Sequence, residues 1–477
     1  MTDAPMRVAI VGAGAAGTTT AWRLRQRLGD AVHITVYERL EHVGGRAWDL
    51  HFAGTRIEVG GTLLHSSGKY TMELMKLTDS KEGSSGLSID GKDETYAFWT
   101  DAGFSVLTHS SMASMALGIL KYVGVGSARR VVNTATSMAA KWDRVYELLD
   151  GGSSFATPQD LLKALGLYEA TQVSLKDYLD GLKVNARMTH DIVESIVHNM
   201  YNQGAEIGAL AGLVGLAGAG LAGGYLFAIE EGNWTVYDKT LKAIGADLHT
   251  ETQVVAIEAS SPEASSPEAS NPAQAGEKER PFVVRGADGG ADSFDAVVLA
   301  APLALADLEI SVDGRPLDAR AYPYQEVQTT LVVGTLDPAY FGASPTKKLP
   351  STVFTADSAG APFKSIGVTG YSPSYDCRIY KIFSAEHEMT DEELGRIFST
   401  IHDVYRFVWR GAYPVISPGI DHVPFELAPG LFYACAFETA AGAIEVESVA
   451  GYNTAELAAN YLSLPRPLNR EMGTDRE

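Results

Sequence analysis

A glycine-rich turn near the N-terminus constrains the fold of this chain more than any other feature. A short β-type run over residues 7–11 leads into GAGAAG at residues 12–17, and an amphipathic helical pattern follows over residues 18–28. A second β-type run covers residues 32–37 and is followed at once by an acidic residue, Glu38. This order of strand, glycine turn, helix and strand predicts a βαβ unit of a Rossmann-type α/β fold.

The residues of this turn predict a site for the phosphates of a dinucleotide. Gly12 permits the tight turn, Gly14 lets the backbone approach a pyrophosphate, and Gly17 lets helix and strand pack closely. The N-terminus of the helix then faces the negative charge, and Glu38 would accept hydrogen bonds from the ribose hydroxyls. The cofactor contacts expected here are Gly12, Ala13, Gly14, Ala15, Ala16, Gly17, Glu38 and Arg39. The alternative is a glycine turn that binds nothing.

Composition limits the size and partners of the protein. A chain of 477 residues exceeds the size of one hydrophobic core, so two domains are expected. Hydrophobic residues make up 45% of it and charged residues 20%, as in ordinary globular proteins. The formal net charge of −21 argues against nucleic acid and anionic lipid as partners, because both need clustered Lys and Arg.

The cysteines and histidines offer no framework for disulfides or metals. Cys377 and Cys435 form no CxxC pair, which fits a reducing compartment. The histidines show no HxH or HExxH pattern, so no metal site is expected. Residues 1–6 lead directly into the first strand pattern, without the regions of a signal peptide. We therefore expect a cytoplasmic protein.

One uncharged segment, residues 207–229, is long enough to cross a bilayer and is rich in small residues. A membrane span is one interpretation. Against it, no Lys or Arg flanks the segment closely, and Glu206, Glu230 and Glu231 bound it. We expect instead a buried helix whose small side chains leave space for an apolar ligand.

Segment patterns divide the chain into two interleaved domains. Helical patterns dominate from about residue 70 to 226, including residues 112–122 and 139–149, and β-type runs return at 252–259, 282–285 and 296–300. Later β-type runs cover 328–334 and 378–383, and a helical run covers 448–464. The expected cofactor domain comprises residues 1–70, 225–309 and 420–465, and the α+β substrate domain 71–224 and 310–419. Residues 261–279 are expected to be a disordered insertion and 466–477 a mobile tail.

Further glycine motifs carry a resemblance to known flavoproteins. Gly44-Gly45-Arg46 follows Glu38, and Gly60-Gly61 comes next, an order that resembles the amine oxidase and protoporphyrinogen oxidase superfamily. The resemblance implies FAD as cofactor. It implies contacts from Gly45, Arg46, Gly60, Gly61 and Thr62, from Val254 in a strand that holds adenine, and from Glu438 and Val446 near the C-terminus. At the last strand the usual Ala-Gly is Ala436-Phe437 here.

Other segments resemble, in collinear order, the prenylcysteine oxidase family within that superfamily. The run from Gly60 to His65 is similar to the family's glycine pair and histidine. Tyr201-Asn202-Gln203 resembles a Tyr-Gly-Gln segment, and residues 228–233 resemble a turn from which Glu231 departs. The resemblance implies His65 and Lys381 as candidate catalytic residues, and Tyr201, Gln203 and Gly215 as candidate substrate residues.

The resemblance also implies an activity. In that family a flavin takes a hydride from the carbon next to a thioether sulfur, water adds, and the products are an aldehyde, a free thiol and, after reaction with dioxygen, hydrogen peroxide. A small-molecule or peptide thioether and dioxygen are then the expected partners. Sulfur stabilises the developing cation, so no catalytic triad or metal is needed. Animal members carry signal sequences, so the compartment does not carry over.

Two other functions remain open from the sequence. An FAD-dependent amine oxidase or a desaturase of an apolar molecule would use the same glycine series, but an amine oxidase would usually show an aromatic pair near the last strand. The aromatic residues there are Phe432, Tyr433 and Phe437, which is weak evidence against an amine oxidase. A flavin-free binding protein on the same fold is a further alternative, which the intact glycine motifs disfavour.

Overall fold

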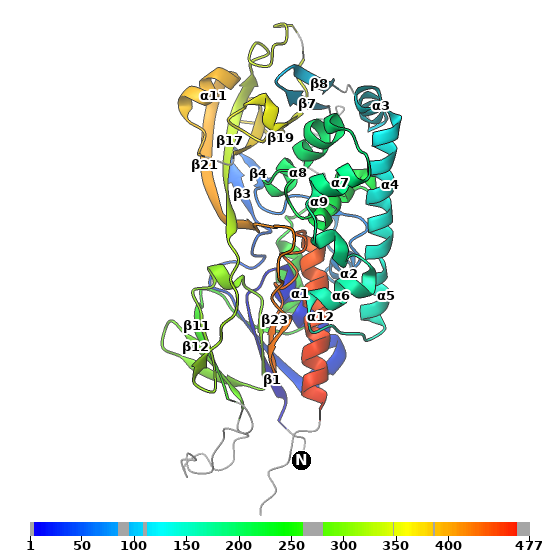
Figure 1. Cartoon of the computed structure of the whole chain (residues 1–477). Coiled ribbons are helices and arrows are strands. Elements are labelled where there is room, and N and C mark those ends of the chain that lie inside the picture. Colours follow the sequence, from blue (N-terminus) through cyan, green and yellow to red (C-terminus); the bar gives the residue numbers. More distant parts are fainter. Residues whose placement is uncertain are drawn as a thin grey trace, which may run out of the picture.

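The computed structural model describes residues 4–83, 95–107, 112–260, 280–346, 348–384 and 387–464. A six-stranded sheet in the order β10-β2-β1-β14-β23-β22 carries the N-terminal unit (Figure 1). Its strands are β1 (Met6–Val11), β2 (Val32–Tyr37), β10 (Asp247–His249), β14 (Ala296–Leu299), β22 (Glu426–Ala428) and β23 (Leu431–Tyr433). All pairs are parallel except β22 with β23.

The predicted βαβ unit is confirmed. Strand β1 pairs with β2 on one side and β14 on the other, and Val8, Ala9 and Ile10 are completely buried, as expected for a central parallel strand. Helix α1 (Ala15–Leu28) begins three residues earlier than its pattern indicated. Helix α12 (Ile444–Ser463) packs on α1 so closely that only a glycine fits at Gly451, where a Cβ would lie 2.2 Å from the Ala16 carbonyl oxygen.

A seven-stranded sheet in the order β21-β17-β20-β19-β18-β7-β8 forms the other end of the molecule (Figure 1). Its strands are β7 (Tyr96–Thr100), β8 (Gly103–Leu107), β17 (Tyr324–Leu336), β18 (Thr352–Thr355), β19 (Ser365–Ser372), β20 (Cys377–Ser384) and β21 (Phe398–Pro414), with α11 (Asp391–Ile397) before β21. The β-type runs at 328–334 and 378–383 were thus correctly identified as strands.

Strands β7 and β8 lie in the stretch that was expected to be mostly helical, so that expectation was incomplete. Strand β7 pairs in parallel with β18, more than 200 residues further along the chain. Pairing between segments so far apart in the chain leaves no local pattern in the sequence beyond one short hairpin. The helical patterns on either side of that hairpin therefore dominate a prediction made from the sequence.

Apart from a two-residue strand at Glu82–Gly83, the other described elements of that stretch are helices and helical turns. The helices are α2 (Lys69–Leu77), α3 (Met112–Val123), α4 (Val125–Trp142), α5 (Arg144–Asp150), α6 (Pro158–Leu165), α7 (Leu175–Gly181), α8 (Glu194–Tyr201) and α9 (Ala209–Leu216), with a 3-10 turn η2 (Tyr168–Thr171) and a π-helical turn η3 (Arg187–Val193). The apolar pattern over residues 139–149 spans two helices, because α4 ends at Trp142 and α5 begins at Arg144.

The apolar segment 207–229 is not one buried helix, so that prediction was wrong in its second half. After α9 a π-helical turn, η4 (Ala217–Leu221), contains Gly220 at φ 92°, and Gly223 and Gly224 also have positive φ. The chain then forms β9 (Leu226–Ile229), which pairs with β5 (Leu64–His65) and β6 (Glu82–Gly83). Glycines in left-handed conformations end the helix. Within the described ranges, no helix is long and apolar enough to span a bilayer.

We call the six-stranded sheet, together with the elements that follow here, the cofactor half of the molecule. A five-stranded sheet contains β11 (Val254–Ala259), β12 (Phe282–Gly286), β13 (Ala291–Phe294), β15 (Glu309–Val312) and β16 (Arg315–Pro316), and a hairpin contains β3 (Asp49–Phe52) and β4 (Thr55–Glu58). Helix α10 (Thr235–Ala243) and the short turns η1 (Gly29–Ala31) and η7 (Leu303–Leu305) also belong to this half. The turn η8 (Asp357–Ala359) lies between β18 and β19 of the seven-stranded sheet. The expected insertion 261–279 and tail 466–477 lie outside the described residues.

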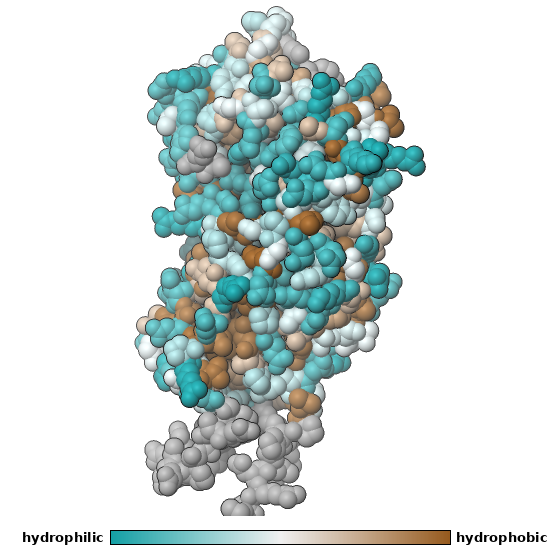
Figure 2. All heavy atoms as spheres, viewed as in Figure 1, coloured by the Kyte–Doolittle hydropathy of each residue, from teal (hydrophilic) through white to brown (hydrophobic). Residues whose placement is uncertain are grey.

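The hydrophobic core joins both halves of the molecule. One large cluster runs from the six-stranded sheet through α1 and α12 into the helices α4 to α9, and a smaller cluster fills the seven-stranded sheet. Figure 2 shows the face seen in Figure 1 as mostly hydrophilic, with hydrophobic residues gathered in its lower half. The helices therefore share one continuous core with the cofactor half.

Candidate active site

Two glycine loops, residues 12–17 and 44–46, face each other beyond the carboxyl end of β1. The Gly44 amide donates to the Ala13 carbonyl at 2.9 Å. Gly14 is the N-cap of α1 and no side chain caps that helix. A Cβ built on Gly14 would have the Gly45 Cα as its nearest atom, at 3.9 Å. The first amides of α1 thus face a space bounded by two stretches of bare backbone, into which a pyrophosphate fits.

Gly12 and Gly17 are required by the backbone itself. Gly12 has φ +110°, and a Cβ there would lie 2.6 Å from the Ala300 carbonyl oxygen. A Cβ on Gly17 would lie 2.0 Å from the Gly12 carbonyl oxygen. These contacts account for the tight turn and the close helix packing that the sequence indicated.

Glu38 lies at the end of β2 and holds the glycine loop. Its carboxylate accepts from the amides of Ala13 (2.9 Å) and Leu40 (3.0 Å), and it is 7% exposed. A carboxylate has about four acceptor positions, so both oxygens can still accept from a ligand. Thr252 donates to the Glu38 carbonyl at 2.8 Å and brings the start of β11, with buried Val254, to the same edge. Arg39 donates to the Leu305 carbonyl at 2.9 Å.

A buried polar cluster surrounds Arg46. Its guanidinium bonds Glu438 through both Nη atoms, and Tyr324 donates to Glu438 Oε2 at 2.5 Å. The Cys435 sulfur and one carboxylate oxygen each from Glu438 and Glu447 lie within 4.8 Å of one another. We call these five residues the Arg46 cluster. A shallow pocket opens beside Tyr324 and Cys435.

The Arg46 cluster contains two carboxyl groups, those of Glu438 and Glu447, but only one arginine. Burial raises the pKa of Glu447 well above its usual range, and the neighbouring Glu438 raises it further. Glu447 Oε2 has no hydrogen-bond partner in the part of the chain that the structure describes. Burial lowers the pKa of Arg46, but Glu438 and Glu447 more than offset this, and the net shift is upward. Arg46 therefore stays charged, and burial beside Glu438 favours the protonated form of Glu447.

Lys381, on β20, contacts residues on both sides of the second glycine pair. Its Nζ donates to Thr62 Oγ1 at 2.8 Å and to the Glu58 carbonyl at 3.1 Å. Burial lowers the pKa of Lys381 to about 8, although Glu58 raises it. A Cβ on Gly60 would lie 1.9 Å from the Arg46 carbonyl oxygen. The lysine is therefore not a surface residue, and it links the seven-stranded sheet to the glycine pair beside Arg46.

The N-terminus of α12 meets the same glycine pair. A Cβ on Gly61 would lie 2.8 Å from Ile444 Cδ1, and Val446, in the first turn of α12, is 3% exposed. Asn233 Nδ2 donates to the carbonyls of Gly61 (2.7 Å) and Thr62 (3.0 Å). The structure therefore brings Gly60, Gly61, Thr62, Lys381 and Val446 into one region, with Arg46 on its other side.

Tyr201 and Tyr413 form an aromatic wall next to this region. Their rings are 5.3 Å apart in an edge-to-face arrangement. A Cβ on Gly442 would lie 3.2 Å from Tyr413 and 3.5 Å from Tyr201, and a Cβ on Gly215 would lie 3.1 Å from Tyr201. The Tyr201 hydroxyl is buried and has no hydrogen-bond partner among the described residues. A buried hydroxyl in that state is suited to a ligand or a water.

Gln203 and His65 have other contacts. The Gln203 amide donates to the Pro414 carbonyl (3.1 Å) and accepts from the Ile416 amide (3.0 Å), so it fixes the strand that carries Tyr413. His65 Nδ1 lies 2.7 Å from Ser67 Oγ, and Nε2 lies 3.0 Å from the Gly223 carbonyl. Both His65 nitrogens thus have partners, at the glycine turn that follows η4 and not at Lys381.

Sequence reasoning missed Tyr324, Tyr413, Asn233 and Glu447. Each reaches the region from an element distant along the chain. Asn233 lay within the family-like turn at residues 228–233, but that motif did not mark it as a site residue. Glu447 did leave a signal, since it is an acidic residue between apolar Val446 and Val449 on a helix that packs against the core. An acid on the buried face of a helix marks a paired or protonated carboxyl group.

Comparisons with known proteins agree with this geometry. The family model described as prenylcysteine lyase matches residues 112–465, and the NAD(P)-binding Rossmann-like domain model matches residues 10–78. Farnesylcysteine lyase from Arabidopsis thaliana is 29% identical over 95% of this chain and 88% of its own length. Prenylcysteine oxidase 1 from Homo sapiens is 27% identical over 95% of this chain and 89% of its own.

Solved structures share the fold at low identity. A putrescine oxidase variant redesigned for cofactor binding superposes with a TM-score of 0.62 at 16% identity, covering 94% of this chain and 98% of its own. Cyclohexylamine oxidase from Brevibacterium oxydans superposes with a TM-score of 0.60 at 15% identity, covering 96% and 100%. At such identities the likeness concerns the fold alone.

Proposed function

The chain belongs to the prenylcysteine lyase family, and from this we propose that it is an FAD-dependent oxidoreductase that cleaves the thioether of a prenylcysteine-like substrate. Bound FAD supplies the oxidant, accepting a hydride from the carbon next to sulfur, after which water and dioxygen lead to an aldehyde, a free thiol and hydrogen peroxide. The observation that carries the proposal is the bare-backbone cradle between Gly14 and Gly45 at the uncapped start of α1.

The chain's own residues fit FAD. The first amides of α1 face the space for a pyrophosphate, and Glu38 keeps acceptor positions for ribose hydroxyls. Arg46 supplies a positive charge next to that space. The raised pKa of Glu447 favours its neutral form, which limits the negative charge of the Arg46 cluster near the phosphates.

Lys381 is proposed to hold the proton that oxygen reduction requires. With a pKa of about 8, its Nζ is protonated at neutral pH yet able to release the proton. Thr62 and the Glu58 carbonyl fix the position of Nζ beside the glycine pair. This arrangement supports a role at the cofactor that a solvated lysine could not fill.

The aromatic wall of Tyr201 and Tyr413 is proposed to bind the substrate. Thioether oxidation needs an apolar site that excludes bulk water and presents one carbon to the oxidant. Gly215 and Gly442 let these rings pack closely against the backbone, and the Tyr201 hydroxyl, which has no partner among the described residues, can bind the water that adds to the oxidised carbon. His65 is proposed to lie at the outer end of the same site, beside the Gly223 turn.

We propose, on the basis of its cysteines, that the enzyme is cytoplasmic. Cys377 and Cys435 are the two cysteines of the chain, and both are free thiols. Free thiols are typical of a reducing compartment.

The test is an anaerobic spectrum of the purified protein mixed with farnesylcysteine, followed by air and a peroxide assay. Bleaching of the flavin band, then release of farnesal, cysteine and peroxide, is the expected result. The matched control is the analogue with a methylene group in place of sulfur, which should bleach the flavin far more slowly because carbon has no lone pair to stabilise the developing cation. Putrescine and cyclohexylamine test the amine alternative. Bleaching by an amine and not by the thioether would overturn the proposal.

A further inference from the structure

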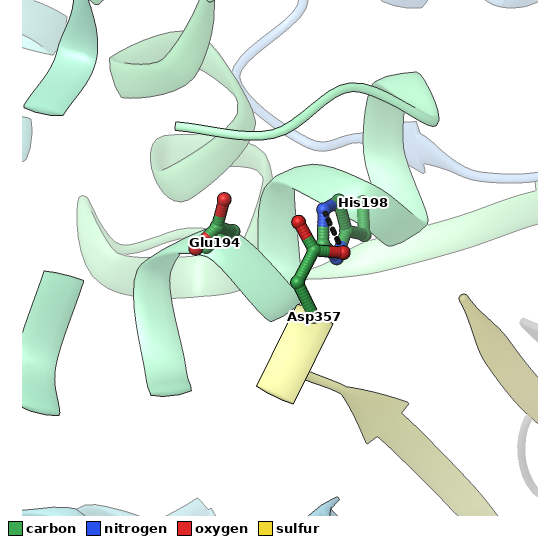
Figure 3. A group of neighbouring side chains, drawn as sticks. All are labelled: Glu194, His198 and Asp357. Carbon is green, nitrogen blue, oxygen red and sulfur yellow. Dashed lines mark ion pairs between the residues drawn. The ribbon is translucent and has the colours of Figure 1, made fainter. Parts of the chain in front are cut away.

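A second polar cluster lies on α8, the helix that ends at Tyr201. Glu194 and His198 project from this helix, and Asp357 reaches them from η8 (Figure 3). Each offers one ligand atom, and these atoms lie within 4.8 Å of one another. We call these three residues, with His190, the α8 cluster.

The spacing along the helix places the side chains on one face. His190, Glu194 and His198 recur every four residues. His190 Nδ1 lies 3.1 Å from Glu194 Oε2, and His198 Nε2 lies 3.5 Å from Asp357 Oδ1. Ligands of a tetrahedral zinc ion, each at about 2.0–2.2 Å, lie about 3.3–3.6 Å from one another. The His198–Asp357 pair thus has nearly the separation of two ligands around one ion, and the Glu194 ligand atom lies within 4.8 Å of both.

His198 is held in the orientation of a metal ligand. It is 1% exposed, and its Nδ1 lies 3.2 Å from the Thr355 carbonyl oxygen, which can only accept. In the neutral ring the proton is therefore on Nδ1, and Nε2 points its lone pair toward Asp357. Burial, followed by Lys364, lowers the pKa of His198, which favours the neutral ring. A lone pair facing carboxylate oxygens calls for a cation between them.

Solvent can reach the cluster, and one cation already competes for it. The side chains of Asp357 and His190 are 57% and 47% exposed, which gives an ion a path of entry. Lys364 Nζ bonds Asp357 Oδ1 at 2.5 Å. Lys364 engages the same Asp357 oxygen that faces His198 Nε2, so an ion must displace this ammonium or bind through Asp357 Oδ2.

We propose that the α8 cluster binds a divalent transition-metal ion with the preferences of Zn²⁺, through His198 Nε2 and the carboxylates of Glu194 and Asp357, with water in the fourth position and His190 bonded to Glu194. One imidazole and two carboxylates are a donor set that suits zinc better than Ca²⁺ or Mg²⁺, which prefer oxygen ligands alone. The ion would tie α8 to the segment after β18. Because α8 ends at Tyr201, it would also stiffen the helix that carries the aromatic wall.

The experiment uses the full-length, FAD-loaded protein, stripped with EDTA, dialysed and titrated with ZnCl₂ by calorimetry. One ion per chain is expected, confirmed by metal analysis after gel filtration, together with a rise in Tm. His198→Gln and Asp357→Asn should each weaken binding at least about tenfold. Lys364→Met should strengthen it, because it removes the competing cation. The control is His402→Gln, which removes an exposed histidine that stacks on Tyr375.

Several outcomes would overturn the proposal. Zinc that binds equally well to the His198 and Asp357 variants is held by other surface groups. If the wild-type protein takes up no zinc, the cluster is only an ion pair between protonated His198 and Asp357. Asp357 is half-exposed, so its variant should fold even if the His198 variant does not. FAD content, read at the flavin band, should be the same in all variants.

Discussion

The cofactor cradle and the aromatic wall are built in opposite ways. The cradle is backbone: Gly14 and Gly45 approach because neither has a side chain, and a Cβ at Gly17 would overlap a carbonyl oxygen. The wall is side chain: Tyr201 and Tyr413 come from different elements and meet by packing. The cradle should therefore fail sharply on the smallest addition, whereas the wall should change by degrees. Substitutions can test that contrast.

The largest effect should come from the glycines of the cradle. Gly17→Ala should leave little soluble protein, because its Cβ would lie 2.0 Å from the Gly12 carbonyl oxygen. Gly14→Ala should fold, because the nearest atom to its Cβ is 3.9 Å away, yet raise the Kd for FAD by about tenfold or more by entering the ligand's space. Solubility and flavin content measure the two effects.

A matched control for these variants is Gly395→Ala, in α11, where a Cβ meets nothing within 4 Å. It should keep its FAD and gain up to about 1 kcal/mol of stability, since alanine favours a helix. If Gly14→Ala bound FAD as tightly as this control, the space between the two loops would not be the pyrophosphate site.

Lys381→Met should have the next largest effect. Reoxidation of the reduced flavin by air should slow about a hundredfold, while anaerobic reduction by substrate changes little. In the wild type the reoxidation rate should fall as pH rises through about 8, where Lys381 loses its proton, and the variant should lack this dependence. Stopped-flow absorbance measures both steps. An equal slowing of both would make Lys381 a structural residue.

At the aromatic wall, Gly215→Leu should raise KM for farnesylcysteine about tenfold, because the added side chain must displace Tyr201. FAD content should not change. Tyr201→Phe should be milder, since it keeps the ring and removes a hydroxyl that has no partner in the described chain. Steady-state kinetics with farnesylcysteine and a shorter prenyl homologue measure the graded response. Unchanged kinetics for Gly215→Leu would take the wall out of the substrate site.

The smallest effect concerns stability and pH at Glu447. Burial and Glu438 raise its folded-state pKa above the ordinary value of 4.5, so the folded chain keeps a proton that the unfolded chain releases. The contribution of Glu447 to stability therefore falls as pH rises from about 4.5 toward the raised pKa. Glu447→Gln should flatten this part of the Tm-versus-pH curve. A variant curve parallel to the wild type would mean that Glu447 is ionised in the fold.

The contrast also explains which site residues could be predicted from the sequence. Gly12, Gly17 and Glu38 were assigned because strand, turn and helix follow one another locally, and a short stretch of sequence determines their geometry. Lys381 was named only by resemblance, and nothing local marked it as buried. Tyr324 and Tyr413 were missed because each lies on a long strand. The sequence does not show which face of such a strand points toward the site until the segments that pack against it are known.

The sequence by itself determined the Rossmann-type unit, the family and the positions where only glycine fits, because these depend on backbone sterics within a few turns of chain. Tertiary structure decided that residues 207–229 break into a helix, a π-turn and a strand, because β9 needs β5 and β6 to pair with. It also decided that Glu447 meets Glu438 beside Arg46 and that Asp357 meets His198. Contacts between charged groups depend on which distant segments pack together, and packing is settled only when the whole core forms.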